Sequence, residues 1–104
     1  MNSVLPLTLR REFFDQIAAG EKTIEYREQK PYWKTRLEGK TFDLVRFRNG
    51  YHANAPEMEV EFRGVRKVRK WGGLWYAISL GRVLKTKRWK PVSAKNRASL
   101  GGRA

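Results

Sequence analysis

Hydrophobic and polar residues recur with two different periods along the chain, about two residues in some segments and about 3.6 in others. Leucines occupy alternate positions in residues 4–9, which predicts a strand. In residues 11–19, REFFDQIAA, the apolar side chains fall on one helical face, and a glycine follows where many helices end. In residues 22–27, KTIEYR, Ile24 and Tyr26 alternate with polar side chains, which predicts a second strand with these two residues facing inward.

The later segments continue this pattern. A short helix is predicted over residues 31–38, because it begins with a proline and is followed by a glycine. Strands are predicted over residues 41–48 and 58–63, and Gly64 leads into a basic stretch that extends the second of them past a bulge. After a Gly-Gly turn, residues 74–84 form a last strand. This order predicts an α+β fold, a small, mainly antiparallel sheet or barrel with one or two covering helices.

Charge divides the chain into two parts. Its 104 residues include 23 Lys and Arg against 10 Asp and Glu, a formal net charge of +13. Residues 85–104 hold seven basic and no acidic residues and have lost the apolar periodicity, so we expect one folded domain over residues 1–84 and a disordered basic arm after it. Such an arm suits a polyanion, because Lys and Arg release counterions from phosphates.

Several functional classes are excluded by composition. Without cysteine, the chain has no disulfide, no thiol nucleophile and no Cys-based metal site. A single histidine leaves almost nothing for a His-based metal site or a Ser-His-Asp triad, and we expect neither a metal nor a cofactor. The first residues lack the features of a secretory signal, and no run approaches the ~18 apolar residues of a membrane span. We therefore expect a monomeric cytoplasmic protein that does not contact membranes.

A charged motif lies between the first predicted helix and the second strand. Gly20, Lys22, Glu25 and Arg27 match the pattern G-x-K-x-x-E-x-R. With the helix before it, the Pro-aromatic segment after it and the closing strand, the motif resembles the ASCH domain family, which is related to the PUA fold. The resemblance covers about residues 5–84. It implies a small PUA-like β-barrel, a cleft lined by this motif and a link to RNA binding.

The motif residues also suggest chemistry on their own. Glu25 and Arg27 lie two apart on one strand, so their side chains share a face, opposite to that of Ile24 and Tyr26. They can pair with each other, or offer an acceptor and a bidentate donor to a base edge and a phosphate. Lys22 begins the strand and can lean toward the same cleft. The alternative is a surface ion pair without a ligand.

An enzyme is the second hypothesis. Some characterised ASCH relatives hydrolyse N4-acetylcytidine or cleave RNA, and in the amidohydrolases a threonine three residues after the lysine is the nucleophile. Here that position is Glu25, whereas Thr23 follows Lys22 directly. The family's third residue, a glutamate before the last strand, has no counterpart in VRKVRKWGGLW, and Glu59 and Glu61 are the nearest substitutes. A different hydrolase, either an N4-acylcytidine amidohydrolase or a ribonuclease, would use Lys22 and Glu25 as acid and base.

Basic and aromatic residues interleave outside the motif, a combination typical of single-stranded nucleic-acid binding. We therefore expect RNA, another single-stranded nucleic acid or a nucleoside-like small molecule as the partner. Two of the arginines, Arg46 and Arg48, are expected to point to the same side as Arg27. A third hypothesis is a protein-interaction module whose basic tail docks an acidic partner. The candidate contacts beyond the motif are Arg46, Arg48, Tyr51, Arg66, Lys67, Arg69, Lys70 and Trp71.

Overall fold

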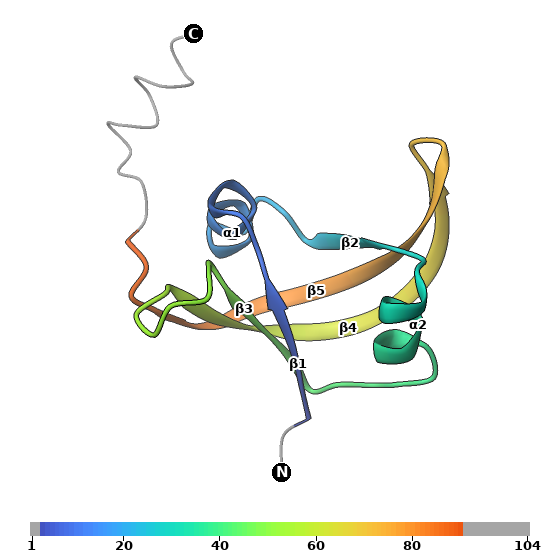
Figure 1. Cartoon of the computed structure of the whole chain (residues 1–104). Coiled ribbons are helices and arrows are strands. Elements are labelled where there is room, and N and C mark those ends of the chain that lie inside the picture. Colours follow the sequence, from blue (N-terminus) through green and yellow to red (C-terminus); the bar gives the residue numbers. More distant parts are fainter. Residues whose placement is uncertain (1–2, 91–104) are drawn as a thin grey trace, which may run out of the picture.

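The computed structural model describes residues 3–90, which form a curled five-stranded sheet and two short helices (Figure 1). Along the sheet the strand order is β1-β3-β4-β5-β2, and β1 pairs with β3 in parallel while the other pairs are antiparallel. The α+β class and the mainly antiparallel sheet are thus confirmed, as an open half-barrel rather than a closed one. The elements are β1 (Val4–Thr8), α1 (Arg11–Ala18), β2 (Ile24–Glu28), α2 (Pro31–Leu37), β3 (Leu44–Arg48), β4 (Glu57–Lys70) and β5 (Gly73–Lys87).

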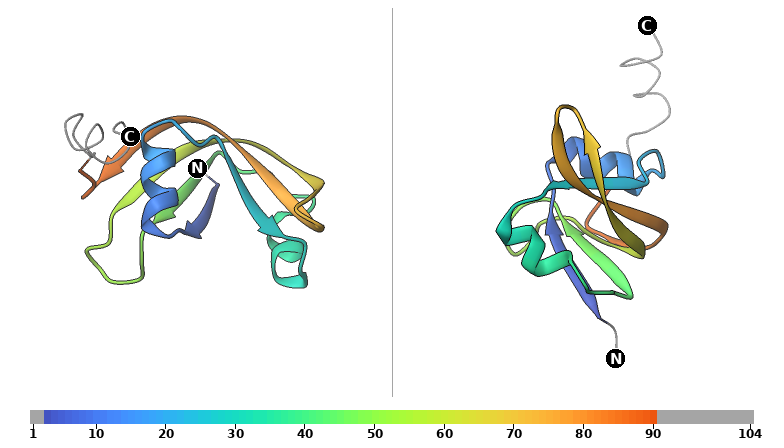
Figure 2. Two further views of the ribbon diagram at one scale, coloured as in Figure 1. Left: turned by 90° about the horizontal axis from the view of Figure 1, so that it is seen from above. Right: turned by 90° about the vertical axis from the view of Figure 1, so that its right-hand side faces the viewer.

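Two long strands, β4 and β5, determine the curvature of the sheet. Figure 2 shows them as an arch, with α1 near one end and α2 near the other. The pairing of β4 with β5 shifts register at several points between Glu59 and Gly64, and Gly64 has a φ of +126°. Bulges increase the local bend of a strand, and a glycine accepts this backbone conformation without strain. The predicted bulge is confirmed, and it allows one hairpin to span both ends of the half-barrel.

The core fills the concave side of the arch. Leucines of β1, Val45 and Phe47 of β3, and Met58 and Val60 of β4 alternate inward, as their sequence spacing predicts. From α1, Phe14 completes this layer. The buried apolar residues that form the core cluster are Leu5, Leu7, Leu9, Phe14, Ile17, Leu37, Val45, Phe47, Met58, Val60, Tyr76, Ile78 and Leu80.

The orientation of β2 differs from the prediction. Glu25 and Arg27 lie opposite two buried residues of β5, so they point to the concave side, and Glu25 is itself buried. Ile24 and Tyr26 point the other way, and the expectation that they form the inward face is wrong. Alternation alone assigns the apolar residues to the inside. Here β2 is an edge strand, and cations neighbouring its carboxylate make an inward charge tolerable.

The folded part of the chain extends beyond the predicted domain end. β5 continues to Lys87, and Trp89 packs against the core and donates its indole N–H to Asp15 at 2.8 Å. Residues 85–90 are therefore part of the domain, and residues 91–104 of the expected arm lie outside the described residues. Among the described residues, no helix has the length and apolar character needed to cross a membrane.

One carboxylate on β4, Glu61, predicts a pH effect on stability. Glu61 accepts hydrogen bonds from the Arg82 backbone N–H and from the Arg63 side chain, both at 2.9 Å, and these lower its pKa from 4.5 to about 2. A depressed folded-state pKa contributes stability above the unfolded value, and this contribution is lost as the pH falls toward about 2. Glu61→Gln should therefore unfold at a lower urea concentration than wild type at pH 7. This difference in urea midpoint, the gap between the two proteins, should become smaller in acid.

Urea unfolding at neutral pH and near pH 3 measures this gap. Glu12→Gln is the matched control, because Glu12 is exposed and makes no ion pair with the described residues. It should follow wild type at both pH values. An equal Glu61→Gln gap at both pH values would contradict the prediction.

Candidate functional site

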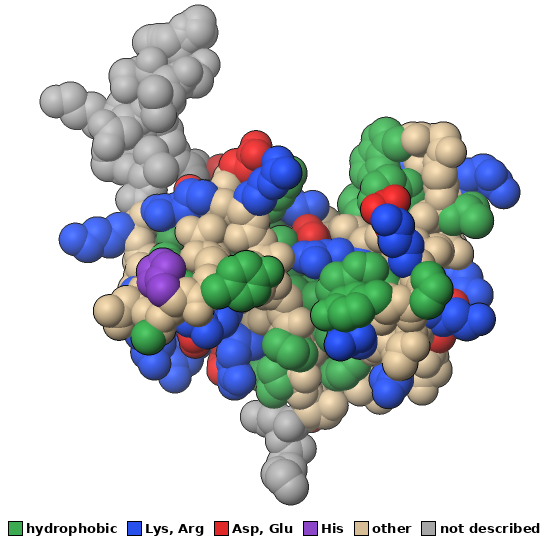
Figure 3. Space-filling view, in the orientation of Figure 1, with side chains coloured by type: hydrophobic (Ala, Val, Ile, Leu, Met, Phe, Trp, Pro, Cys, Tyr) green, Lys and Arg blue, Asp and Glu red, His purple; other side chains and the backbone are tan. Residues whose placement is uncertain are grey.

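A cleft of about 400 Å³ lies between α1, the start of β2 and the turn that joins β4 to β5. Its lining residues are Phe13, Lys22, Glu25, Tyr26 and Trp71. In Figure 3 the surface is hollowed between the α1 side and the β4–β5 hairpin. The cleft therefore combines two residues of the G-x-K-x-x-E-x-R motif with three aromatic side chains from separate elements.

The end of α1 places the motif lysine in the cleft. The helix ends at Ala18, and Gly20 just after it has a φ of +81°, which suits a glycine after a helix. The backbone N–H groups of Glu21 and Lys22 then both donate to the carbonyl of Gln16, at 2.8 and 3.1 Å. This turn folds the chain back over the helix end, and the Lys22 side chain consequently reaches Glu25 on β2.

Glu25 is a buried carboxylate between two cations, with 7% of the residue exposed. Its Oε1 lies 3.4 Å from Lys22 Nζ, and its Oε2 accepts a hydrogen bond from Arg27 Nε at 3.0 Å. Lys22 also donates to the backbone carbonyl of Ile24 at 2.5 Å. The two cations offset the cost of burying the carboxylate and leave the group with a net positive charge.

Aromatic rings enclose this charged group. Tyr26 and Trp71 meet edge to face at 4.9 Å between ring centroids, and Lys22 Nζ lies 5.7 Å from the centroids of both Phe13 and Tyr26. Lys70 donates to the Tyr26 hydroxyl at 3.1 Å and lies 5.0 Å from the centroids of Tyr26 and Trp71. Cations over aromatic faces are favourable, so lysines and rings hold each other in place.

Trp71 occupies a strained position in the hairpin turn. Lys70, the last residue of β4, pairs with Gly73, the first residue of β5, and the two turn residues between them, Trp71 and Gly72, have φ values of +50° and +72°. Both central residues of such a turn need positive φ, which favours Asn-Gly and costs other residues about 1–2 kcal/mol. Trp71 is nevertheless 65% exposed. An exposed ring at a costly backbone position favours a role in binding.

Arg27 lies beside the cleft without lining it. Its guanidinium donates to Glu25 and, through Nη2, to the backbone carbonyl of Thr8 at 3.1 Å, and its Cζ is 4.9 Å from the Trp33 ring centroid. Thr8 belongs to β1, the opposite edge strand of the half-barrel. Arg27 therefore bridges the two open edges of the sheet and positions Glu25.

The arginines of β3 lie on the other face of the sheet. Val45 and Phe47 point inward, so Arg46 and Arg48 between and after them point to the convex side, away from Arg27. The expectation that these arginines share a face with Arg27 is wrong. Their partners are carboxylates of the neighbouring strand: Arg46 contacts Glu59 at 3.1 Å, and Arg48 contacts Glu57 at 3.2 Å.

The basic residues of the hairpin divide by environment. Lys67 contacts Glu38 at 3.2 Å, and Lys70 is held over the aromatic rings of the cleft. Arg66 and Arg69 are exposed and make no ion pair or side-chain hydrogen bond with the described residues. They remain available for phosphates. Tyr51, another stacking candidate, is 87% exposed in the loop between β3 and β4 and does not line the cleft.

The catalytic candidates come together only in part. Lys22 and Glu25 contact each other, but Thr23 is exposed and does not line the cleft. Glu25 pairs with Ile78 of β5, and Ile78 pairs with Val65 of β4. Glu59 and Glu61 come several residues before Val65 on β4, so they are not level with Glu25 across the sheet. Within residues 3–90 no group of three acidic or histidine side chains is placed to hold a metal ion.

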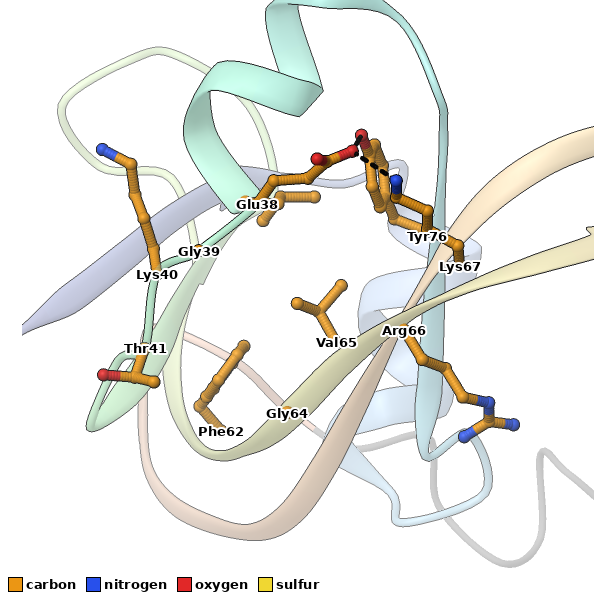
Figure 4. Close-up of a pocket in the computed structure, with 11 residues that line it drawn as sticks. Glu38, Gly39, Lys40, Thr41, Phe62, Gly64, Val65, Arg66, Lys67 and Tyr76 are labelled. Atoms are coloured by element: carbon orange, nitrogen blue, oxygen red, sulfur yellow. Dashed lines mark hydrogen bonds and ion pairs between the residues drawn. The ribbon is translucent and has the colours of Figure 1, made fainter.

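A second polar cluster was missed by sequence reasoning. The Tyr76 hydroxyl donates to Glu38 at 2.5 Å, and Lys67 approaches the same carboxylate (Figure 4). The hydrogen bonds from Tyr76 and Lys67 lower the pKa of Glu38, while burial and the Glu38 carboxylate raise the pKa of Tyr76 to about 12. No spacing signal links Glu38 with Tyr76, because the two residues belong to distant segments and Tyr76 reads as an ordinary core residue of a strand.

Comparisons of the chain with protein-family models, curated proteins and solved structures gave no match. The resemblance to the ASCH family consequently stays a prediction from the motif and its position between α1 and β2.

Proposed function

We propose that this protein binds RNA, or another single-stranded nucleic acid, by holding one base in the cleft of Phe13, Tyr26 and Trp71. On this proposal the half-barrel is a PUA-like fold of the ASCH kind. The observation that carries it is the set of three rings around a buried, cation-held carboxylate. Aromatic side chains stack on splayed bases, each worth about 1–3 kcal/mol.

The polar groups of the cleft suit the edge of a base. Lys22 donates one N–H to the carbonyl of Ile24 and forms an ion pair with Glu25 at 3.4 Å, so it keeps an N–H for a ligand. Glu25 Oε1 faces Lys22 in this ion pair, while the hydrogen bond from Arg27 goes to Oε2, so Oε1 keeps a lone pair for a donor of the ligand. A donor and an acceptor therefore stand side by side, as the adjacent acceptor and donor of a base edge require.

The charge of the chain supplies the sequence-independent part of binding. With a net charge of +13, the protein attracts phosphates at long range. Arg66 and Arg69 stand on the same hairpin as Trp71, and neither is neutralised by a described carboxylate. A strand with one base on Trp71 would place its neighbouring phosphates near this hairpin.

Replacing the exposed tryptophan tests the proposal. Trp71→Asn removes the ring but keeps a residue that tolerates positive φ, so the turn should persist. We expect the affinity for a fluorescein-labelled, mixed-sequence single-stranded RNA, measured by anisotropy, to fall about tenfold because one stacking contact is lost. Tyr32→Ala is the control, since Tyr32 is an exposed ring on α2 outside the cleft. Equal affinities of Trp71→Asn and wild type would refute the proposal.

The same preparation separates the alternatives. A hydrolase has the Lys22–Glu25 contact in its favour, and it would turn over N4-acetylcytidine or cut the RNA, with the activity lost in Lys22→Ala. An interaction module that docks an acidic protein through the basic tail would retain its partner after nuclease treatment.

A further inference from the structure

A second hollow, of about 500 Å³, lies between the chain that follows α2 and the bent part of β4. This volume is within the range of small-molecule sites. In Figure 4 Phe62 and Val65 project into it from β4, and Glu38, Lys67 and Tyr76 meet at one end. Its lining residues are Leu37, Glu38, Gly39, Lys40, Thr41, Phe62, Gly64, Val65, Arg66, Lys67 and Tyr76.

The walls of this hollow are mostly apolar. Leu37 and Tyr76 are buried, and Phe62 and Val65 are half-buried with their side chains toward the open space. Two of the lining residues, Gly39 after α2 and Gly64 on β4, have no side chain to fill the space. Such walls accept a flat, largely apolar ring.

The polar end combines a fixed acceptor with a donor. Glu38 Oε2 accepts a hydrogen bond from the Tyr76 hydroxyl and forms an ion pair with Lys67 Nζ. Glu38 Oε1 has no partner among the described residues. The lowered pKa of Glu38 keeps it a carboxylate, an acceptor only, through the neutral range. Lys67 keeps further N–H groups. A ligand ring must therefore carry a donor for Glu38 and an acceptor beside it for Lys67.

The rim adds unpaired positive charge. Lys40 and Arg66 lie on opposite sides of the hollow in Figure 4, with their charged ends turned outward, and neither makes an ion pair or side-chain hydrogen bond with the described residues. With Lys67 they outnumber Glu38, the acidic lining residue, by three charges to one. The ligand must then also bear an anionic group outside its ring.

We propose that this hollow is a separate binding site for a nucleoside monophosphate, with the base between Phe62 and Val65 and its edge on Glu38 and Lys67. The phosphate lies at the rim, on Lys40 or Arg66. A nucleotide combines the three required features: a planar ring, adjacent donor and acceptor atoms on its edge, and an anion. A simple aromatic acid lacks the adjacent donor and acceptor on its ring edge, and a neutral base lacks the anion. The site shares no residue with the cleft around Glu25.

Titration of the full chain with AMP, CMP, GMP and UMP, followed by amide chemical shifts in NMR, tests this site. Gly39 and Gly64 line the hollow, so their amide signals should shift to saturation with at least one nucleotide. Glu38→Gln should weaken this binding about tenfold, because a hydrogen bond to a charged acceptor is lost. Glu28→Gln, an exposed glutamate on β2, should bind as wild type does. Inorganic phosphate alone should leave the glycine signals in place.

Two results would overturn the proposal: no saturable shift of Gly39 or Gly64 with any of the four nucleotides, or equal affinity of Glu38→Gln and wild type. The Trp71→Asn variant separates this site from the cleft. Trp71→Asn should bind the nucleotide with the same affinity as wild type, whether or not its affinity for RNA falls. Loss of the Gly39 and Gly64 shifts in Trp71→Asn would assign the nucleotide to the cleft and end the case for a second site.

Discussion

Glu25→Ala should lower the free energy of unfolding by about 3 kcal/mol, because it leaves two enclosed cations without their anion. The exposed fractions are 10% for the Glu25 side chain, 19% for Lys22 and 18% for Arg27. Removing one partner of a buried ion pair costs about 3–5 kcal/mol. The lower end applies here, since each cation keeps a backbone carbonyl as acceptor.

Urea unfolding at pH 7, followed by tryptophan fluorescence, measures this loss. Glu28→Ala is the matched control on the same strand: Glu28 also pairs with a lysine, Lys30, at 3.4 Å, but more than half of its side chain is exposed. Exposed pairs contribute about 0–1 kcal/mol. Glu25→Gln should fall between the two, because the amide retains an acceptor without the charge. A Glu25→Ala midpoint equal to that of Glu28→Ala would mean that the charged group contributes nothing to the fold.

This outcome bears on how the site is tested. Glu25 supports the fold and lines the cleft, so loss of binding in Glu25→Ala would mix two effects. Trp71 is exposed and stands in a turn, which makes it the cleaner probe of recognition. Arg27 reaches across to β1, and its loss would loosen the edges of the half-barrel as well as the carboxylate.

The elements that the sequence predicts well are those with local signals. Alternating leucines give β1, and the apolar face of residues 11–19 gives α1. Gly20 and Gly39 follow the two helices and both have positive φ, the conformation for which glycine is selected there. Each of these signals acts within a few residues, so no knowledge of the sheet is needed to read it.

The features that the sequence does not predict depend on contacts between distant segments. The inward orientation of Glu25 depends on Arg27 and Lys22, which neutralise its charge, and the apolar–polar pattern does not encode this pairing. The Glu38–Tyr76 hydrogen bond joins the end of α2 to β5, and the hydrogen bond from Trp89 joins the chain after β5 to α1. In each case one tertiary contact overrides local composition.

Salt should weaken RNA binding more than any single substitution does. If four phosphates contact cations of the protein, the affinity for a single strand varies with salt to the power of about −2.8, so a fourfold rise in salt lowers it about fiftyfold. Arg69→Gln removes a cation that has no described partner and should reduce this exponent by about 0.7. Anisotropy titrations over a series of salt concentrations give the exponent for each variant.

Arg46→Gln is the matched control for this charge effect. It removes the same charge, but the Arg46 guanidinium lies on the convex face and is already held by Glu59 at 3.1 Å. The two variants therefore distinguish the net charge of the protein from the positions of its unpaired cations. If net charge alone governs binding, both variants will change the exponent equally; if the hairpin beside Trp71 carries the phosphates, only Arg69→Gln will. An affinity that is the same at low and high salt would contradict phosphate binding altogether, and with it the part that the hairpin arginines play in the proposed function.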